Sequence, residues 1–492
     1  MLDGEFAIVV VDYANGTALY STDVFGTKPL WIGLGSKAND EYARSLVATN
    51  SSAGRAPPAI GVATYPSALE GLGFKRSELT QVLPNTATVV SLDAPYRTLS
   101  TRRLYEFDLR QHKSTVDDWD KAFNEALRKR VQHVKFPVFV ALSGGYDSGL
   151  ISAGLMGLGF KDHTITIVGD REDEIVYRRN ELCGDLCMPK YFHLSVQDIR
   201  HEREYIATSV EPFEYDIPEP GTVRDRDGKG KGKGQSFKHY VVAQDEASVG
   251  VSTVMKLARE SGILVYLSGG GVDEIVTDYG FHGKPHYGHH SQSSFAGLFP
   301  GNLSDIYPWS NFFAGTQRVY LMKEEHVGGS HGVETRYPFL DVALVQEFLW
   351  LTADYKNAVY KHPLDEVLTR KGYPFTRGHK MGFHISPCWR SLEPIVGIPL
   401  WVGPVDPFGC GPRGIALVAS YISLAASAVV AAAISIILYK RSSGTMASPL
   451  GKTVGLIVAS SWELRRRKRL AIAIAFVSLA TTAVLLVFPS FL

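Results

Sequence analysis

The sequence predicts an α/β protein in which helices cover both faces of a parallel sheet, with a β-rich segment before it and apolar segments after it. Between residues 115 and 395, short β-prone runs alternate with helical patterns. The first 110 residues carry several β-prone runs, and the chain is strongly apolar beyond residue 413. Strands that alternate with helices are typical of parallel sheets, because each crossover places a helix on one face.

The first 110 residues predict antiparallel strands. Residues 5–12 (EFAIVVVD) form a β-prone run, Asn15-Gly16 predicts a turn, and residues 17–21 predict the returning strand. Further β-prone runs lie at residues 30–34 and 87–92. The chain starts acidic before it turns apolar and lacks a basic leader, so we do not expect a signal peptide.

The middle of the chain alternates between the two patterns. Residues 116–133 carry apolar side chains at helical spacing, residues 136–142 predict a strand, and residues 150–158 predict a helix. Further strands are predicted at 163–168 and 263–267. Residues 211–234 are rich in proline, glycine and charge, which indicates a long loop or a flexible insertion.

Charge and cysteine content exclude some classes of protein. The formal net charge is +1, which gives no reason to expect a nucleic-acid partner. Four cysteines are too few for a disulfide scaffold. Cys183 and Cys187 offer half of a metal site, but no second pair stands at zinc-finger spacing, so we expect packed thiols.

The most specific feature is the turn SGGYDS at residues 143–148, which follows a predicted strand and opens a helix. Its glycines allow an anion to approach the backbone, its serines can donate hydrogen bonds, and the helix N-terminus is electropositive. No lysine follows the glycines as it does in a P-loop. Asp147 therefore suits a magnesium ion among phosphates. The alternative is a tight strand-to-helix turn that binds nothing.

A second turn of the same kind, SGGGVDE, occupies residues 268–274 and also follows a predicted strand. Two such turns in one parallel sheet lie at its carboxyl edge, where α/β folds bind their ligands. The pair predicts a site for ATP and Mg²⁺, with one turn holding pyrophosphate and the other closing over nucleotide and metal.

These turns resemble motifs of the asparagine synthetase family. The run GVETRYPFLD at 332–341 resembles a third signature, and KHPL at 361–364 with HKMGF at 379–383 resembles a later lysine-bearing region. At the front, LDGEFA at 2–7 and DVFGTKPL at 23–30 resemble the family's class II glutamine amidotransferase domain. The resemblance implies a remnant of that domain at 1–110, and a synthetase domain with an adenine nucleotide alpha-hydrolase-like sheet at 115–395.

The resemblance implies a ligase that adenylates a carboxylate, that of aspartate, releases pyrophosphate, and then lets ammonia displace AMP. It assigns ATP contacts to Leu142, Val168, Ser268 and Gly269, pyrophosphate binding to Ser143, Gly144, Gly145, Asp147 and Ser148, Mg²⁺ to Asp147 and Asp273, and the α-phosphate to Lys380. Asp147, Asp273 and Lys380 are thus the expected catalytic residues. Glu334 and Arg336 are interpreted as a buried ion pair that supports the site.

The sequence departs from the family at three places. The family's glutaminase begins with a nucleophilic cysteine, whereas the first cysteine here is Cys183. We therefore expect an inactive glutaminase half, with nitrogen supplied as ammonia or by a separate glutaminase. Gly270 stands where the family often has an acidic or polar residue that serves the amine. Gly250 replaces an arginine, the natural clamp for a carboxylate.

These departures keep two alternatives open. One is an enzyme that adenylates another acid or uses another amine. The other is a catalytically weakened, membrane-bound homologue that acts as a scaffold.

The last segment, residues 413–492, predicts a membrane-anchoring region. Residues 415–439 and 470–492 carry no charge, and each is longer than the roughly 20 residues that span a bilayer. The basic stretch between them is expected in the cytosol. If both segments spanned, the ATP domain would lie on the opposite side of the membrane, in an organelle whose inner compartment contains ATP. If only 470–492 spans, the ATP domain faces the cytosol. We expect a membrane-anchored protein with its ATP domain in the cytosol, and a lipid bilayer as partner.

Overall fold

The computed structural model describes residues 3–35, 59–92, 97–168, 173–218, 237–285, 293 and 295–378. One compact unit covers Met1–Pro387, and the second, Cys388–Leu492, lies outside the described residues. The predicted membrane segments at 415–439 and 470–492 belong to the second unit, so the membrane anchor stays a prediction. Within the described ranges, no helix combines the length and apolar character that crossing a bilayer requires.

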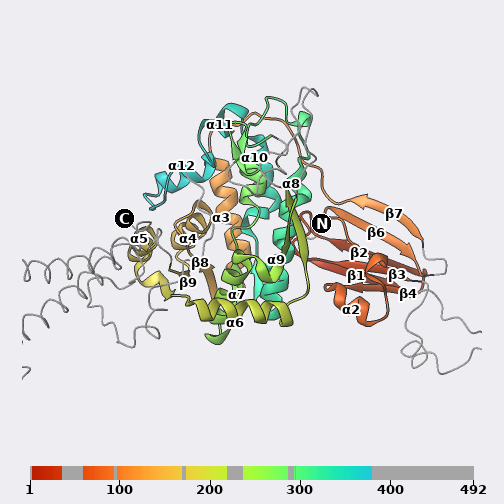
Figure 1. The fold of residues 1–492 in the computed structure, drawn as a ribbon. Helices are drawn as coiled ribbons and strands as arrows, with labels where there is room; N and C mark the ends of the chain where they lie inside the picture. The colour runs from red at the N-terminus through yellow and green to blue at the C-terminus, as the bar shows by residue number, and fades with distance from the viewer. Residues whose placement is uncertain are drawn as a thin grey trace, which may run out of the picture. The chain divides into compact units, whose positions relative to one another are not determined.

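The N-terminal part is β-rich, as predicted, and forms two antiparallel sheets. One sheet has the order β1-β2-β6-β7 and the other the order β4-β3-β5 (Figure 1). The turn at Asn15-Gly16 joins β1 to β2, which pair in register from Ala7 opposite Thr22 to Asp12 opposite Thr17. The elements are β1 (Ala7–Asp12), β2 (Thr17–Thr22), β3 (Trp31–Gly35), β4 (Ala59–Ala63), α2 (Pro66–Gly71), η1 (Arg76–Glu78), β5 (Leu79–Gln81), β6 (Thr86–Ser91) and β7 (Thr98–Arg103).

The next part contains the predicted parallel sheet, whose five strands run in the order β10-β9-β8-β13-β16. Its first elements are α3 (Asp117–Val131), β8 (Val138–Ala141), α4 (Tyr146–Gly157), β9 (Asp162–Ile167), α5 (Asp173–Cys183), η2 (Gly184–Leu186), β10 (Cys187–Phe192), α6 (Val196–Ser209), β11 (Glu214–Pro218), β12 (Phe237–Val241), η3 (Val242–Gln244) and α7 (Glu246–Glu260). They are followed by β13 (Val265–Leu267), η4 (Asp273–Thr277), β14 (Gly280–Phe281), β15 (Lys284–Pro285), η5 (Leu303–Asp305), α8 (Ser310–Phe313), α9 (Gly315–Ser330), β16 (Glu334–Arg336), η6 (Pro338–Leu340), α10 (Val342–Trp350), α11 (Ala353–Ala358) and α12 (His362–Arg370).

Helices pack on both faces of this sheet, which confirms the predicted α/β class with a parallel sheet (Figure 1). Alternate residues of β8 point to opposite faces, as in any strand. Val138 and Val140 join a core with α3, α4, α10 and α12, whereas Phe139 joins a second core with α7. A strand covered on both faces has no polar side, which explains why β8 reads as a continuous apolar run.

Two local predictions need correction. Helix α4 begins at Tyr146, inside the predicted turn, so Asp147 and Ser148 lie in its first turn. The predicted loop or insertion at 211–234 begins with an ordered strand, since Glu214–Pro218 pairs antiparallel with Phe237–Val241. Residues 219–236 lie outside the described part of the chain.

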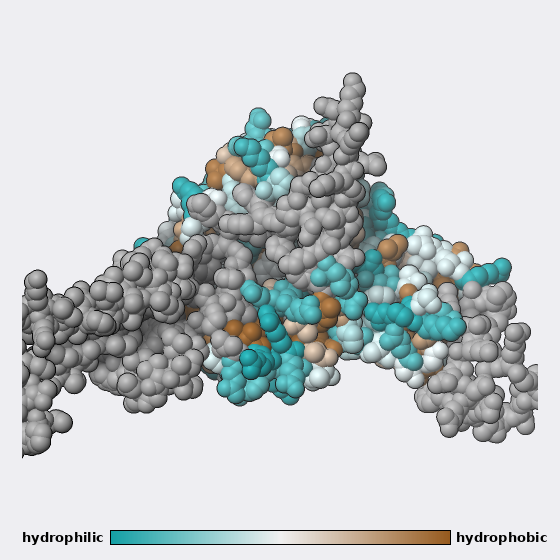
Figure 2. Space-filling view, viewed as in Figure 1, coloured by the Kyte–Doolittle hydropathy of each residue, from teal (hydrophilic) through white to brown (hydrophobic). Residues whose placement is uncertain are grey.

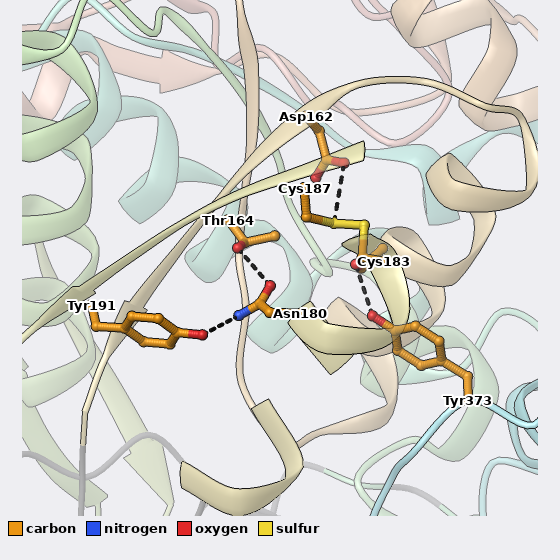
Figure 3. Close-up of a disulfide and its surroundings, with 8 residues drawn as sticks. Asp162, Thr164, Asn180, Cys183, Cys187, Tyr191 and Tyr373 are labelled. Atoms are coloured by element: carbon orange, nitrogen blue, oxygen red, sulfur yellow. Dashed lines mark hydrogen bonds between the residues drawn. A yellow bond between two sulfur atoms is a disulfide. The ribbon is translucent and has the colours of Figure 1, made fainter. Parts of the chain in front are cut away.

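The expectation of packed thiols at Cys183 and Cys187 is wrong, because the two residues form a disulfide between the end of α5 and the start of β10. Figure 3 shows the carboxyl group of Asp162 beside this disulfide. Its Oδ1 lies 3.9 Å from the Sγ of Cys187, and its buried Oδ2 has no hydrogen-bond partner among the described residues. Burial raises the pKa of Asp162 to about 8. A four-residue spacing gave no sign of this pairing.

The described surface in Figure 2 is mainly hydrophilic. Hydrophobic residues appear on this face as small separate groups. Single exposed apolar residues of this kind are normal on a folded chain and need no partner to explain them.

Candidate active site

The two serine–glycine bends meet at the carboxyl edge of the parallel sheet. Ser143 follows β8, and Ser268 follows β13, the strand paired directly with β8. A Cβ atom at Gly269 would lie 2.8 Å from the Cβ of Asp147, closer than real Cβ contacts. The second bend therefore touches the first through a position that only glycine can fill without displacing it. This contact explains why position 269 needs a glycine.

The carboxylates of Asp147 and Asp273 share one cation, the ammonium group of Lys361. The Nζ of Lys361 lies 2.7 and 2.9 Å from the two carboxylate oxygens of Asp147, and 2.9 Å from Oδ1 of Asp273. Only 3% of the Lys361 side chain is exposed. Burial opposes its charge, but the two carboxylates outweigh burial and hold the pKa of Lys361 well above its ordinary value. Hence the two predicted magnesium ligands lie around a single point of positive charge.

Lys361 was not assigned a role by sequence reasoning, although its motif KHPL was part of the resemblance. It precedes helix α12 and adopts a left-handed conformation with φ of 52°. A non-glycine residue rarely takes this conformation, and such residues concentrate at functional sites. Two neighbouring carboxylates, those of Asp147 and Asp273, attract a cation to this place. Their oxygen atoms are the ligand type that Mg²⁺ prefers, so the pair fits a magnesium site.

The hydroxyl groups of the first bend are bonded to one another. The Ser148 hydroxyl oxygen accepts a hydrogen bond from the backbone N–H of Ser143 at 3.1 Å, and it lies 3.0 Å from the Ser143 hydroxyl. The Ser143 hydroxyl in turn accepts from the N–H of Gly145 at 3.2 Å. Helix α4 starts immediately afterwards and has twelve residues, so its positive end lies at this bend. The N–H groups of Ser143 and Gly145 are thus bonded within the bend, and the positive end of α4 is the feature that would attract an anion.

A buried arginine forms hydrogen bonds to the backbone carbonyl groups of the same bend. The guanidinium group of Arg179, on α5, donates to the carbonyl oxygens of Ser143, of Gly144 at 3.2 Å and of Gly145 at 3.0 Å. None of its side chain is left exposed. These three hydrogen bonds fix the position of the carbonyl groups of the bend. The sequence offered no signal for this role, because Arg179 lies in an ordinary helical pattern.

The other predicted nucleotide contacts also lie at this edge of the sheet. Leu142 follows β8 and Val168 follows β9, and both are buried. The backbone N–H of Val168 is bonded to the carbonyl oxygen of Phe192 at 2.8 Å. Lys380 lies outside the described residues, so its role stays a prediction.

Glu334 and Arg336 do form an ion pair, with Nε 2.9 Å from Oε1, but the predicted burial is wrong. The Glu334 side chain is 55% exposed, because both residues lie on β16 at the edge of the sheet. Their backbone matters more: the carbonyl oxygen of Arg336 accepts from the N–H of Ser268 at 2.9 Å and so fixes the start of the second bend.

The N-terminal part reaches this region through charged side chains. The ammonium group of Lys28 lies 2.6 Å from Oε1 of Glu325, on α9, and 2.6 Å from the carbonyl oxygen of Thr335. Glu5 accepts from Arg130 at 2.8 Å. Burial raises the pKa of Glu325 to about 7, against the opposing charge of Lys28.

Comparisons with known proteins agree with the resemblance drawn from the motifs. The asparagine synthetases (glutamine-hydrolyzing) of Cricetulus griseus and Mus musculus are each 24% identical over 383 residues, which is 74% of this chain and 60% of each relative. The asparagine synthetase (glutamine-hydrolyzing) 2 of Arabidopsis thaliana is 22% identical over 352 residues, 71% of this chain and 50% of the relative. No family model matches the chain.

The matched region thus spans half to three fifths of the length of these curated relatives. It covers most of the described part of the chain, including a parallel sheet whose two serine–glycine bends meet. Motifs, fold and similarity agree, and together they identify the chain as a distant relative of the asparagine synthetase family.

Proposed function

We propose that this chain is an ATP-dependent, amide-forming ligase of asparagine synthetase type. It adenylates a carboxylate, with aspartate as the leading candidate, releases pyrophosphate, and then transfers the acyl group to an amine with release of AMP. The observation that carries the proposal is the shared cation: Asp147 and Asp273 come from different bends and converge on Lys361 at 2.7 and 2.9 Å.

The chemistry of the first step explains these residues. ATP brings a highly charged phosphate chain, and pyrophosphate leaves with further negative charge. The electropositive N-terminus of α4, which begins at this bend, suits the phosphate oxygens. Asp147 and Asp273 would hold Mg²⁺, which supplies charge neutralisation on the leaving group. Lys361 then contacts the phosphates as a second cation at the same place.

The second step needs an amine that attacks the acyl adenylate. Ammonia, or nitrogen from a separate glutaminase, is the proposed source. The substrate acid is open to test, because Gly250 lies buried on α7 without the side chain that would clamp a second carboxylate. That feature keeps another acid as the alternative substrate, and a weakened, membrane-bound scaffold as the alternative role.

ATP–pyrophosphate exchange separates these possibilities. The chain is incubated with ATP, MgCl₂, labelled pyrophosphate and one acid at a time from a panel that includes aspartate. Exchange with aspartate alone supports the proposal. Exchange with a different acid would show that this acid is the substrate. Asp273→Asn should abolish exchange, whereas Asp118→Asn on the exposed side of α3 should leave it unchanged. Absence of exchange with every acid would refute the ligase and favour the scaffold.

A further inference from the structure

Amide formation requires a group that takes a proton from the attacking amine, because the nitrogen gains a bond to carbon and becomes positively charged. The described carboxylates near the two bends differ in the groups that contact them. Asp147 and Asp273 contact Lys361, and Glu325 contacts Lys28 and the hydroxyl of Tyr337. These three face cations. A carboxylate held by neutral groups would be the better proton acceptor.

The carboxylate of Glu324 accepts its hydrogen bond from a neutral hydroxyl group instead of an ammonium group. It lies on α9, and its Oε2 accepts a hydrogen bond of 2.6 Å from the hydroxyl of Ser268. The Ser268 hydroxyl accepts in turn from the backbone N–H of Gly270 at 2.9 Å. This relay from Gly270 through Ser268 fixes the Glu324 carboxylate on the second bend. Glu324 is partly exposed as a residue, whereas Ser268 is 1% exposed.

The surroundings of Gly270 show why the carboxylate comes from α9. A Cβ atom at Gly270 would lie 3.3 Å from the Ser268 hydroxyl oxygen and 3.3 Å from Cδ1 of Tyr337. The ring of Tyr337 and the Ser268 hydroxyl therefore border the place where a side chain at position 270 would start. Glu324 contacts the same Ser268 hydroxyl from helix α9. The bend thus has a carboxylate although position 270 has no side chain.

The charges around Glu324 set its proton affinity. Burial raises the pKa of Glu324, and the Ser268 hydrogen bond, the charges of Lys323 and Lys28, and the Tyr337 hydroxyl oppose that rise. Lys323 is itself 2.8 Å from Asp245, the N-cap residue of α7. Glu325 and Tyr266 also face this region, and Glu324 contributes to the raised pKa of Tyr266. A carboxyl group with raised proton affinity is a better base.

We propose that Glu324 is the proton acceptor in amide formation, a role that rests on the proposed ligase function. The amine lone pair forms the C–N bond at the acyl carbon. The C–O bond to the adenylate breaks, and AMP leaves with its electron pair. One proton passes from the nitrogen to the Glu324 carboxylate and from there to water, so atoms and charge balance. Ser268 and Gly270 position the carboxylate.

The test measures the two half-reactions separately in the full chain. Glu324→Gln removes the base but preserves shape and the bond from Ser268. It should leave ATP–pyrophosphate exchange within about twofold, and slow amide formation from aspartate and ammonium chloride by at least about 100-fold. Glu325→Gln, one residue away, is the matched control and should retain most amide formation.

Glu324→Asp keeps a carboxylate and should recover part of the amide rate, which a merely structural role would not require. Unchanged amide formation in Glu324→Gln, with exchange intact, would overturn this inference alone. Loss of exchange in both Glu324 variants, to the same extent as amide formation, would also overturn it, because the residue would then serve folding or adenylation. Absence of exchange in the unsubstituted chain would overturn the ligase proposal and this inference together.

Discussion

Replacing Lys361 with methionine tests the shared-cation site most directly. The substitution keeps an unbranched side chain of similar length, but it leaves the carboxylates of Asp147 and Asp273 close together without the ammonium group between them. Removing one partner of a buried ion pair costs about 3–5 kcal/mol, because a charge stays buried. The Lys361 side chain is 3% exposed and those of Asp147 and Asp273 are 26% and 15% exposed, so the lower half of that range applies.

Magnesium should reverse much of this loss. A ligand that binds only the folded chain at 100 times its dissociation constant stabilises it by about 2.7 kcal/mol. Two carboxylates without a competing lysine should bind Mg²⁺ more tightly, so MgCl₂ should raise the melting temperature of Lys361→Met more than that of the unsubstituted chain. Thermal unfolding of both proteins in MgCl₂ from 0 to about 10 mM measures the loss of stability and its recovery by magnesium.

Lys356→Met is the matched control, because Lys356 is equally buried but bonds neutral acceptors, Oε1 of Gln111 at 2.8 Å and the carbonyl oxygen of Leu349 at 2.9 Å. Burial lowers the pKa of Lys356 well below its ordinary value. A lowered pKa costs stability below the unfolded pKa, so Lys356→Met should be neutral or stabilising at pH 7. Equal stability of Lys361→Met and the unsubstituted chain, with no response to MgCl₂, would refute the reasoning.

Three further substitutions test separate parts of the structure. Arg179→Leu should release the first bend and weaken ATP binding in calorimetry by about tenfold or more, since each lost charged hydrogen bond costs about 1.5–3 kcal/mol. Gly269→Ala should abolish pyrophosphate exchange because its Cβ would meet Asp147 at 2.8 Å, whereas Gly301→Ala, with open space around it, should not. Asp162 has a raised pKa, so its contribution to stability is present below about pH 4 and is lost as the pH rises to about 8. Asp162→Asn should remove that decline in urea unfolding and gain up to about 4 kcal/mol at pH 7, and a pH-independent difference would contradict this.

The order of elements was predictable because local patterns specify it. The run at 136–142 contains β8, Val138–Ala141, and the helical spacing at 116–133 contains α3, Asp117–Val131. The two bends were predictable for the same reason: serine, glycine and aspartate in that order, placed between a strand and a helix, suit one kind of local backbone. That both bends belong to one edge follows from the parallel direction of their strands.

Other parts of the site were not predictable, because they depend on contacts between distant residues. Arg179 lies 34–36 positions from the carbonyl groups that it holds, and Glu324 lies 56 positions from Ser268. The burial predicted for Glu334 is wrong because β16 is an edge strand. The order of strands depends on the whole sheet, which local sequence patterns do not specify. The disulfide of Cys183 and Cys187 joins residues only four positions apart, but its formation depends on how α5 turns into β10.

By itself the sequence determined the fold class, the position of both serine–glycine bends and the family to which they point. Hydrophobic period and turn chemistry act over a few residues, so they can be read along the chain. The tertiary structure alone decided that Lys361, 214 positions after Asp147, lies between Asp147 and Asp273. Electrostatic attraction acts through space rather than along the chain, so the partner of a buried charge becomes visible only when the chain is folded.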